Sequence, residues 1–329
     1  MRKLKSHNKL TNLQQRRVQR NQDDLESTVD ALSGLVIAHY GDQVDVENSL
    51  DNIIRCNIRQ NLPALAVGDQ VLYLPNLPNL PTLPTGVVIN LLERKSLLVR
   101  NNSAKAVTKP IAANLDQIFI VFAVEPTPES FLIDQFLITA EFCNIQPVLI
   151  LNKYDLITSH FYNKSNNSHE LIEIYKKIGY SVLNTSTHDP SSIQKLEQLL
   201  ANKNSIFIGP SGVGKSTLTQ QFFPNLTIKT GRLSDKILQG KHTTTVAKLY
   251  HLANSGNLID APGVREIGVS HLSQSELENT YPEFRPYLRQ CKFRDCKHII
   301  EPNCAFKSAL TNGHIAPSRW ENYLRFRDG

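Results

Sequence analysis

Two short segments of this sequence carry residue types that bind a nucleotide. The pattern Gly-x4-Gly-Lys-Ser spans residues 209–216, where glycines would let the backbone wrap around a phosphate and Lys215 would neutralise its charge. The Ser216 hydroxyl is a ligand type for Mg²⁺, and a helix that begins there would direct its positive end at the phosphates. The residues of this loop that we expect to contact the nucleotide are Gly209, Pro210, Ser211, Gly212, Val213, Gly214, Lys215, Ser216 and Thr217.

The second segment, Asn152-Lys153-Tyr154-Asp155, is suited to reading a guanine base. A carboxylate accepts both the N1 and the N2 proton of guanine, a pairing that adenine does not offer, so Asp155 is the predicted reader. The stem of Lys153 would cover the base, and Asn152 would tie this segment to the phosphate loop. Residues 184–187 are expected to offer backbone amides to the guanine oxygen.

The order of these two motifs is unusual. An ordinary GTPase carries the phosphate loop before the guanine motif, whereas here the guanine motif comes first. The order predicts a GTPase fold whose chain is circularly permuted, with GTP and GDP as its ligands.

A third motif, Asp260-Ala261-Pro262-Gly263, follows a short apolar run. Asp260 is predicted to hold Mg²⁺ through water, and the Gly263 amide is predicted to bond the γ-phosphate, because only glycine lets the backbone come that close. Upstream, a hydroxyl of Thr243 or Thr244 would reach Mg²⁺ only when a γ-phosphate is present. That contact would make the segment an order-to-disorder switch.

The residue after Gly263 is Val264, where Ras-like enzymes place a glutamine that orients water. A valine cannot orient water, so we expect slow intrinsic hydrolysis unless a partner or His242 supplies the missing group. The predicted catalytic residues are therefore His242, Lys215 and Gly263. An ordinary loop role for His242 stays open.

Near the C-terminal end, three cysteines and a histidine follow the spacing Cys-x4-Cys-x-His-x5-Cys. Three thiolates and one imidazole fill a tetrahedral zinc shell with no open position, which indicates a structural site. The predicted ligands are Cys291, Cys296, His298 and Cys304.

The elements that must position these motifs fall into two patterns. Short β-type runs broken by turn residues predict a small antiparallel barrel, with strands at 34–40, 42–47, 53–59, 70–74, 86–90 and 96–100. From residue 116, apolar runs at 118–124, 148–151, 181–183, 205–208 and 257–259 alternate with helical patterns at 130–144, 169–178 and 191–202. This alternation predicts a doubly wound α/β sheet with its sites at the strand C-termini.

Positive charge is concentrated at the two ends of the sequence. Residues 1–22 hold seven Lys or Arg and no acid, and residues 281–329 hold nine basic and five acidic residues, within a net charge of +6. Basic ends favour contact with a polyanion such as RNA, although a solubilising tail or a transit peptide is the alternative for the first segment. The longest notable apolar run, Ile118–Val124, is too short to cross a bilayer, so we expect a cytoplasmic protein without membrane contact.

The permuted motifs, the preceding barrel and the Cys-Cys-His-Cys cluster together resemble the RsgA family of circularly permuted GTPases, which assist assembly of the small ribosomal subunit. The resemblance implies an OB-fold at 34–110, a permuted P-loop GTPase domain at 111–270 and a zinc-binding α-helical domain at 271–329. Before these domains, the lack of apolar periodicity predicts a basic disordered arm at 1–33. The resemblance also implies that a monomer binds the small (30S) subunit and its rRNA, that the subunit stimulates GTP hydrolysis, and that the protein acts late in maturation. His242 matches a switch histidine proposed to act in hydrolysis, while Ala261 departs from the usual Thr or Ser.

Another function stays open from the residues alone. Because Val264 cannot orient water, the chain would also suit an RNA-binding scaffold that uses GTP only as a structural ligand.

Overall fold

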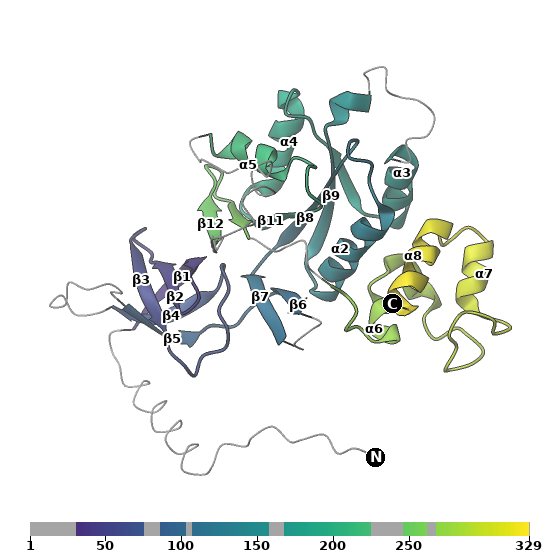
Figure 1. Cartoon of the computed structure of the whole chain (residues 1–329), viewed down its shortest axis with the longest axis horizontal. Coiled ribbons are helices and arrows are strands. Elements are labelled where there is room, and N and C mark those ends of the chain that lie inside the picture. The colour runs from purple at the N-terminus through teal and green to yellow at the C-terminus, as the bar shows by residue number, and fades with distance from the viewer. Residues whose placement is uncertain are drawn as a thin grey trace, which may run out of the picture.

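The structure, a computed structural model, describes residues 31–75, 86–102, 107–157, 168–224, 246–261 and 268–328. Three parts follow one another along the chain: a β-barrel, an α/β sheet and a C-terminal helical module (Figure 1). The predicted arm at 1–33 falls almost wholly outside the described residues, as do His242, Thr243, Thr244 and Gly263.

The first part is a closed barrel of five strands, which confirms the predicted OB-type barrel. The strands are β1 (Leu32–His39), β2 (Gln43–Glu47), β3 (Ile53–Ile58), β4 (Gln70–Pro75) and β5 (Gly86–Leu91). They are ordered β1-β2-β3-β5-β4, and β4 pairs again with β1. Alternate residues such as Val44 and Val46 point into the barrel core. The prediction of a purely antiparallel barrel is wrong in one pairing, because β3 and β5 run parallel.

The strand predicted at 96–100 exists, but it does not belong to the barrel. This strand, β6 (Leu97–Asn102), pairs with β7 (Val107–Ala113) in a separate two-stranded sheet. The physical reason lies in its apolar side chains: Leu98 of β6 and Ile111 of β7 are buried in the core of the α/β part.

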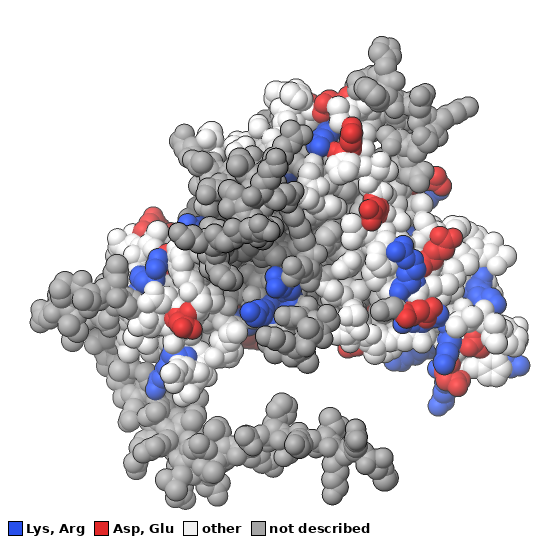
Figure 2. Space-filling model, in the orientation of Figure 1, with Lys and Arg blue, Asp and Glu red and all other residues white. Residues whose placement is uncertain are grey.

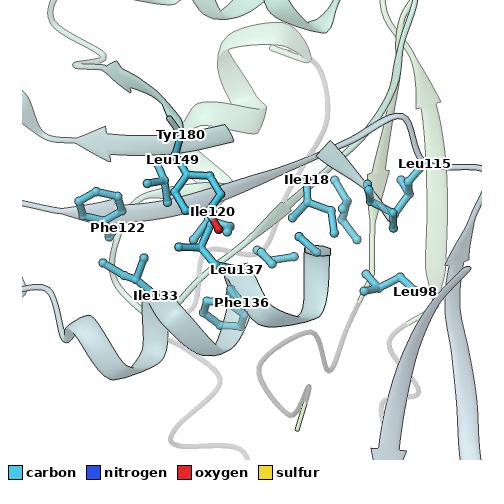
Figure 3. Close-up of a cluster of buried hydrophobic side chains, with 14 of the residues drawn as sticks. Leu98, Leu115, Ile118, Ile120, Phe122, Ile133, Phe136, Leu137, Leu149 and Tyr180 are labelled. Carbon is cyan, nitrogen blue, oxygen red and sulfur yellow. The ribbon is translucent and has the colours of Figure 1, made fainter. Parts of the chain in front are cut away.

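The second part has the predicted alternation of strands and helices. Five parallel strands are ordered β10-β9-β8-β11-β13, where β8 is Gln117–Ala123, β9 Gln146–Asn152, β10 Ser181–Asn184, β11 Asn204–Ile208 and β13 Asn257–Asp260. Helices α2 (Ser130–Phe142) and α3 (Ser168–Ile178) contribute to the core on one face, and α4 (Pro190–Leu200) and α5 (Lys215–Phe222) to the core on the other. Figure 3 shows Phe136 and Leu137 of α2 beside Ile120 of β8.

A sixth strand of this sheet was not predicted. Strand β12 (Ala247–His251) pairs antiparallel with β13 on one side and with barrel strand β1 on the other. Through the pair Ala38 and Lys248, the barrel and the α/β part therefore form one continuous sheet of 11 strands.

The third part is the C-terminal helical module. It contains α6 (Gln274–Asn279), the 3-10 helix η3 (Pro282–Tyr287), α7 (Ala305–Thr311) and α8 (Pro317–Asp328). Helix α6 begins with a capping box in which Ser273 and Glu276 satisfy each other's backbone amides. Aromatic side chains form the module core, among them Tyr281, Phe284 and Phe306. Within the described ranges, no helix is both long and apolar enough to traverse a lipid bilayer.

Candidate functional site

The predicted nucleotide motifs meet at one edge of the α/β sheet. The guanine motif begins at the last residue of β9, the phosphate loop follows β11, residues 184–187 begin at the last residue of β10, and Asp260 ends β13. Because these strands are parallel, their C-terminal ends lie at the same edge. The fold thus brings together segments that are far apart in the chain.

The phosphate loop needs its glycines for two physical reasons. Gly209 has a φ of +144°, and a Cβ atom there would lie 2.0 Å from the carbonyl oxygen of Val121 in β8. Gly214 has a φ of +96°, and its Cβ would lie 2.3 Å from Nδ2 of Asn152. Both the backbone conformation and the close approach of neighbouring atoms exclude larger residues.

Lys215 lies across its own loop. Its Nζ donates to the carbonyl oxygens of Gly209 at 2.8 Å and Pro210 at 2.6 Å. Ser216, in the first turn of α5, is half-buried, and Thr217 is exposed. The ammonium group therefore lies at the mouth of the loop, close to where a phosphate would bind.

Asn152 joins three loops of the site. Its side chain is buried; Nδ2 donates to the Val213 carbonyl at 2.9 Å, and Oδ1 accepts from the Thr185 hydroxyl at 3.0 Å. The guanine motif is thus hydrogen-bonded to the phosphate loop, as expected, and also to the segment after β10.

Asp155 is held by a neighbour that the motif does not include. The buried Ser186 hydroxyl donates to Asp155 Oδ1 at 2.6 Å. Lys153 has a φ of +55°, and its Nζ donates to the Glu125 carbonyl at 2.7 Å. These contacts hold the Asp155 carboxylate and the Lys153 side chain in place within the guanine motif.

Asp260 lies at the end of β13 within the electrostatic reach of Lys215. Although the Asp260 side chain is exposed, partial desolvation by the surrounding protein raises its pKa above the ordinary value, and the Lys215 charge opposes that rise. A cation bound here would offset the desolvation and favour the carboxylate. The predicted contacts of Gly263 with the γ-phosphate and of Thr243 or Thr244 with Mg²⁺ lie outside the described residues.

The four predicted metal ligands come together in the C-terminal module. The ligand atoms of Cys291, Cys296, His298 and Cys304 all lie within 4.8 Å of one another. His298 Nδ1 faces two of the thiols, 3.5 Å from Cys291 Sγ and 3.3 Å from Cys304 Sγ. This donor set and its compactness fit a tetrahedral metal ion.

The other nitrogen of His298 points to a carboxylate. Its Nε2 lies 3.1 Å from Oε1 of Glu278, which also accepts from Gln274 at 2.7 Å. Such an outer carboxylate fixes the ring and leaves Nδ1 for the metal. Sequence reasoning missed Glu278 because it lies 13 residues before the first cysteine, in a helix with no metal-binding pattern of its own.

The chain is similar to known proteins over most of its length. Residues 91–270 match the family model described as RsgA GTPase. A small ribosomal subunit biogenesis GTPase RsgA from Hahella chejuensis is 43% identical over 301 residues, covering 90% of this chain and 83% of the relative. Its namesake from Histophilus somni is 41% identical over 336 residues, covering 97% and 95%.

Two solved structures resemble most of the chain. The crystal structure of YjeQ from Thermotoga maritima is 33% identical with a TM-score of 0.71, covering 91% of this chain and 98% of that one. YloQ, described as a circularly permuted GTPase, is 28% identical with a TM-score of 0.68, covering 92% and 96%. The permuted order of the motifs is therefore shared with a solved fold.

Proposed function

This chain belongs to the RsgA GTPase family and is a GTP hydrolase, and from that premise we propose that it assists late maturation of the small (30S) ribosomal subunit. The subunit is the proposed partner, and its binding is proposed to stimulate hydrolysis. The observation that best supports a single nucleotide site is the hydrogen bond from the Asn152 side chain to the Val213 carbonyl, which joins the guanine motif to the phosphate loop.

In this proposal one nucleotide spans the sheet edge. Asp155 reads the guanine base, and residues 209–217 bind the phosphates. Ser216 and Asp260 would hold Mg²⁺, which supplies charge neutralisation at the phosphates when bound. Lys215 would exchange its two loop carbonyls for phosphate oxygens and so stabilise charge on the transferred group. His242, Thr243, Thr244 and Gly263 keep their predicted roles as proposals.

The Cys-Cys-His-Cys cluster would hold one structural Zn²⁺. Three cysteine thiolates and a histidine whose second nitrogen faces Glu278 make a closed donor set of the kind that zinc prefers. The metal would stabilise a module whose segment from Cys291 to Cys304 contains neither helix nor strand.

The surface of the C-terminal module supports a polyanionic partner. Figure 2 shows Lys and Arg side chains on this module, mixed with acidic ones. Exposed basic residues include Arg289, Lys292, Arg294, Lys297 and Lys307. They would contact rRNA phosphates. We further propose that the protein is cytoplasmic and acts on the subunit as a monomer.

The test measures GTP turnover by the full chain alone, with small subunits and with large subunits as the control. We expect slow turnover alone and a large increase with small subunits only. An unchanged rate would reject the activation proposal. A complete lack of multiple turnover, alone and with subunits, would favour the alternative of an RNA-binding scaffold with GTP as a structural ligand.

A further inference from the structure

Helix α2 is buried on two sides. One stripe, which includes Ile133, Phe136 and Leu137, packs into the core of the α/β sheet. Another stripe, at Asp134, Ile138 and Glu141, has the i, i+4, i+7 spacing of a single helix face. Ile138 belongs to the apolar core of the C-terminal module, and Figure 1 shows α2 between the sheet and that module.

A buried ion pair lies at the centre of this contact. Asp134 is 0% exposed and accepts from Arg319 Nη1 of α8 at 2.5 Å, from Asn322 Nδ2 at 2.7 Å and from the Tyr175 hydroxyl at 2.6 Å. Arg319 is 1% exposed, and its Nε donates to Glu283 at 2.7 Å. Both charges are therefore paired and almost fully removed from water.

Helix α8 also contacts the carboxylate that lies beside the predicted metal ligands. Tyr323, one turn after Arg319, donates to Glu278 Oε1 at 3.1 Å. The same oxygen lies 3.1 Å from Nε2 of the metal ligand His298. Helix α8 thus contacts the α/β part through Arg319 and, through Tyr323, the Glu278 carboxylate that orients His298.

The N-terminal end of α2 leads back to the nucleotide site. The loop before α2 bonds the guanine motif twice: the Val124 amide donates to the Asn152 carbonyl at 3.2 Å, and the Glu125 carbonyl accepts from Lys153. Pro126 in this loop lies 3.9 Å from where a Cβ on Gly212 would be. The helix that receives the module therefore starts beside both nucleotide loops.

We propose that the Asp134–Arg319 pair is an internal clamp that makes α2 and the metal-bearing module one body, coupling the module to the nucleotide loops. The functional side of this inference rests on the proposed function, because it takes binding of the small subunit as the signal that reaches the module. The clamp itself depends only on the contacts described above.

The clamp has the energetics of a buried pair. Removing one partner leaves the other charge buried, and such losses are among the largest that single substitutions cause. An exposed ion pair is screened by water and contributes little. The chain offers that comparison at the same interface, since Arg285 of η3 pairs with Glu141 of α2 at 2.6 Å and is 49% exposed.

The experiment compares hydrogen–deuterium exchange in the full-length wild type, Arg319→Ala and the rim control Arg285→Ala. We expect Arg319→Ala to speed exchange of the slowest amides of both α2 and α8 by at least about tenfold, and Arg285→Ala to change it by less than about twofold. Asp134→Asn is the milder variant, because Arg319 keeps Glu283, and we expect an intermediate increase. Faster exchange in α8 alone, or equal effects of Arg319→Ala and Arg285→Ala, would overturn the clamp.

A second measurement separates the clamp from the proposed function. We expect Asp134→Asn to keep its turnover without subunits within about twofold of wild type and to lose most of the stimulation by small subunits. If small subunits stimulate the wild type and stimulate Asp134→Asn to the same extent, the proposed coupling is wrong. If the wild type itself shows no stimulation, the proposed function fails, and the exchange experiment still decides on the clamp.

Discussion

The Asn152 side chain provides the sharpest test of how the nucleotide site is held together. Asn152→Ala removes two buried hydrogen bonds, to the Val213 carbonyl at 2.9 Å and from the Thr185 hydroxyl at 3.0 Å. Each group that loses its partner in a buried place costs about 1–3 kcal/mol, so for two such groups we expect a loss of roughly 2–6 kcal/mol in the free energy of unfolding. Water entering the vacated space would move the result towards the lower value.

Nucleotide binding is expected to suffer as well. The two hydrogen bonds hold three loops in the arrangement that the ligand needs. Without them, part of the binding free energy is used to order those loops, so the affinity falls. A penalty of about 1.4 kcal/mol weakens affinity tenfold, and we expect at least that reduction for a fluorescent GDP analogue.

Denaturant unfolding and fluorescence titration measure the two effects of Asn152→Ala separately. The matched control is Asn257→Ala, at the first residue of β13 on the opposite edge of the sheet, where the side chain donates to Asn204 at 2.7 Å. The control should lose stability but keep its GDP affinity. If Asn152→Ala has wild-type stability and affinity, or if both variants weaken binding equally, the argument that Asn152 organises the site is wrong.

Three further predictions concern the base, the phosphates and the metal. Asp155→Asn should shift preference from guanine towards xanthine nucleotides by about tenfold or more in competition binding, since its amide would donate where guanine also donates; retained guanine preference would contradict the base-reading role. Gly209→Ala should abolish GDP binding in calorimetry, because its Cβ would lie 2.0 Å from a backbone oxygen, whereas Gly313→Ala, at φ +73° with open space, should bind normally. Glu278→Gln should lower zinc affinity by about tenfold in chelator competition, and the exposed Glu276→Gln on the same helix should not; equal affinities for the two variants would count against an outer-shell role.

Much of the site was predictable because its chemistry is local. Glycines at 209, 212 and 214 occupy positive φ angles that few other residues tolerate, so their spacing alone indicates a phosphate loop. The spacing of the cysteines and the histidine likewise indicates a zinc site, because these residue types supply a complete set of zinc ligands within a short segment. The predicted apolar run Ile118–Val124, which supplies all of β8 except Gln117, is buried at all seven positions, as expected for a central parallel strand.

Two supporting side-chain contacts were not predicted: the sequence placed residues 184–187 beside the base only through their backbone amides, and no local pattern marks Glu278. Ser186 lies 31 residues after Asp155, and Glu278 lies 20 residues before His298, yet each fixes the functional group that the motif supplies. Serine and glutamate at such positions have many ordinary surface roles, and only the packed fold shows which one applies.

The sequence by itself determined the ligand class, the donor sets and the alternation of strands and helices in the α/β part, since these depend on residue types and short spacings. Only the tertiary structure decided the partner of β6, the presence of β12 beside the barrel and the burial of Asp134 against Arg319, 185 residues away. Pairing between distant segments depends on which apolar surfaces meet when the chain packs, and short-range patterns do not contain that information.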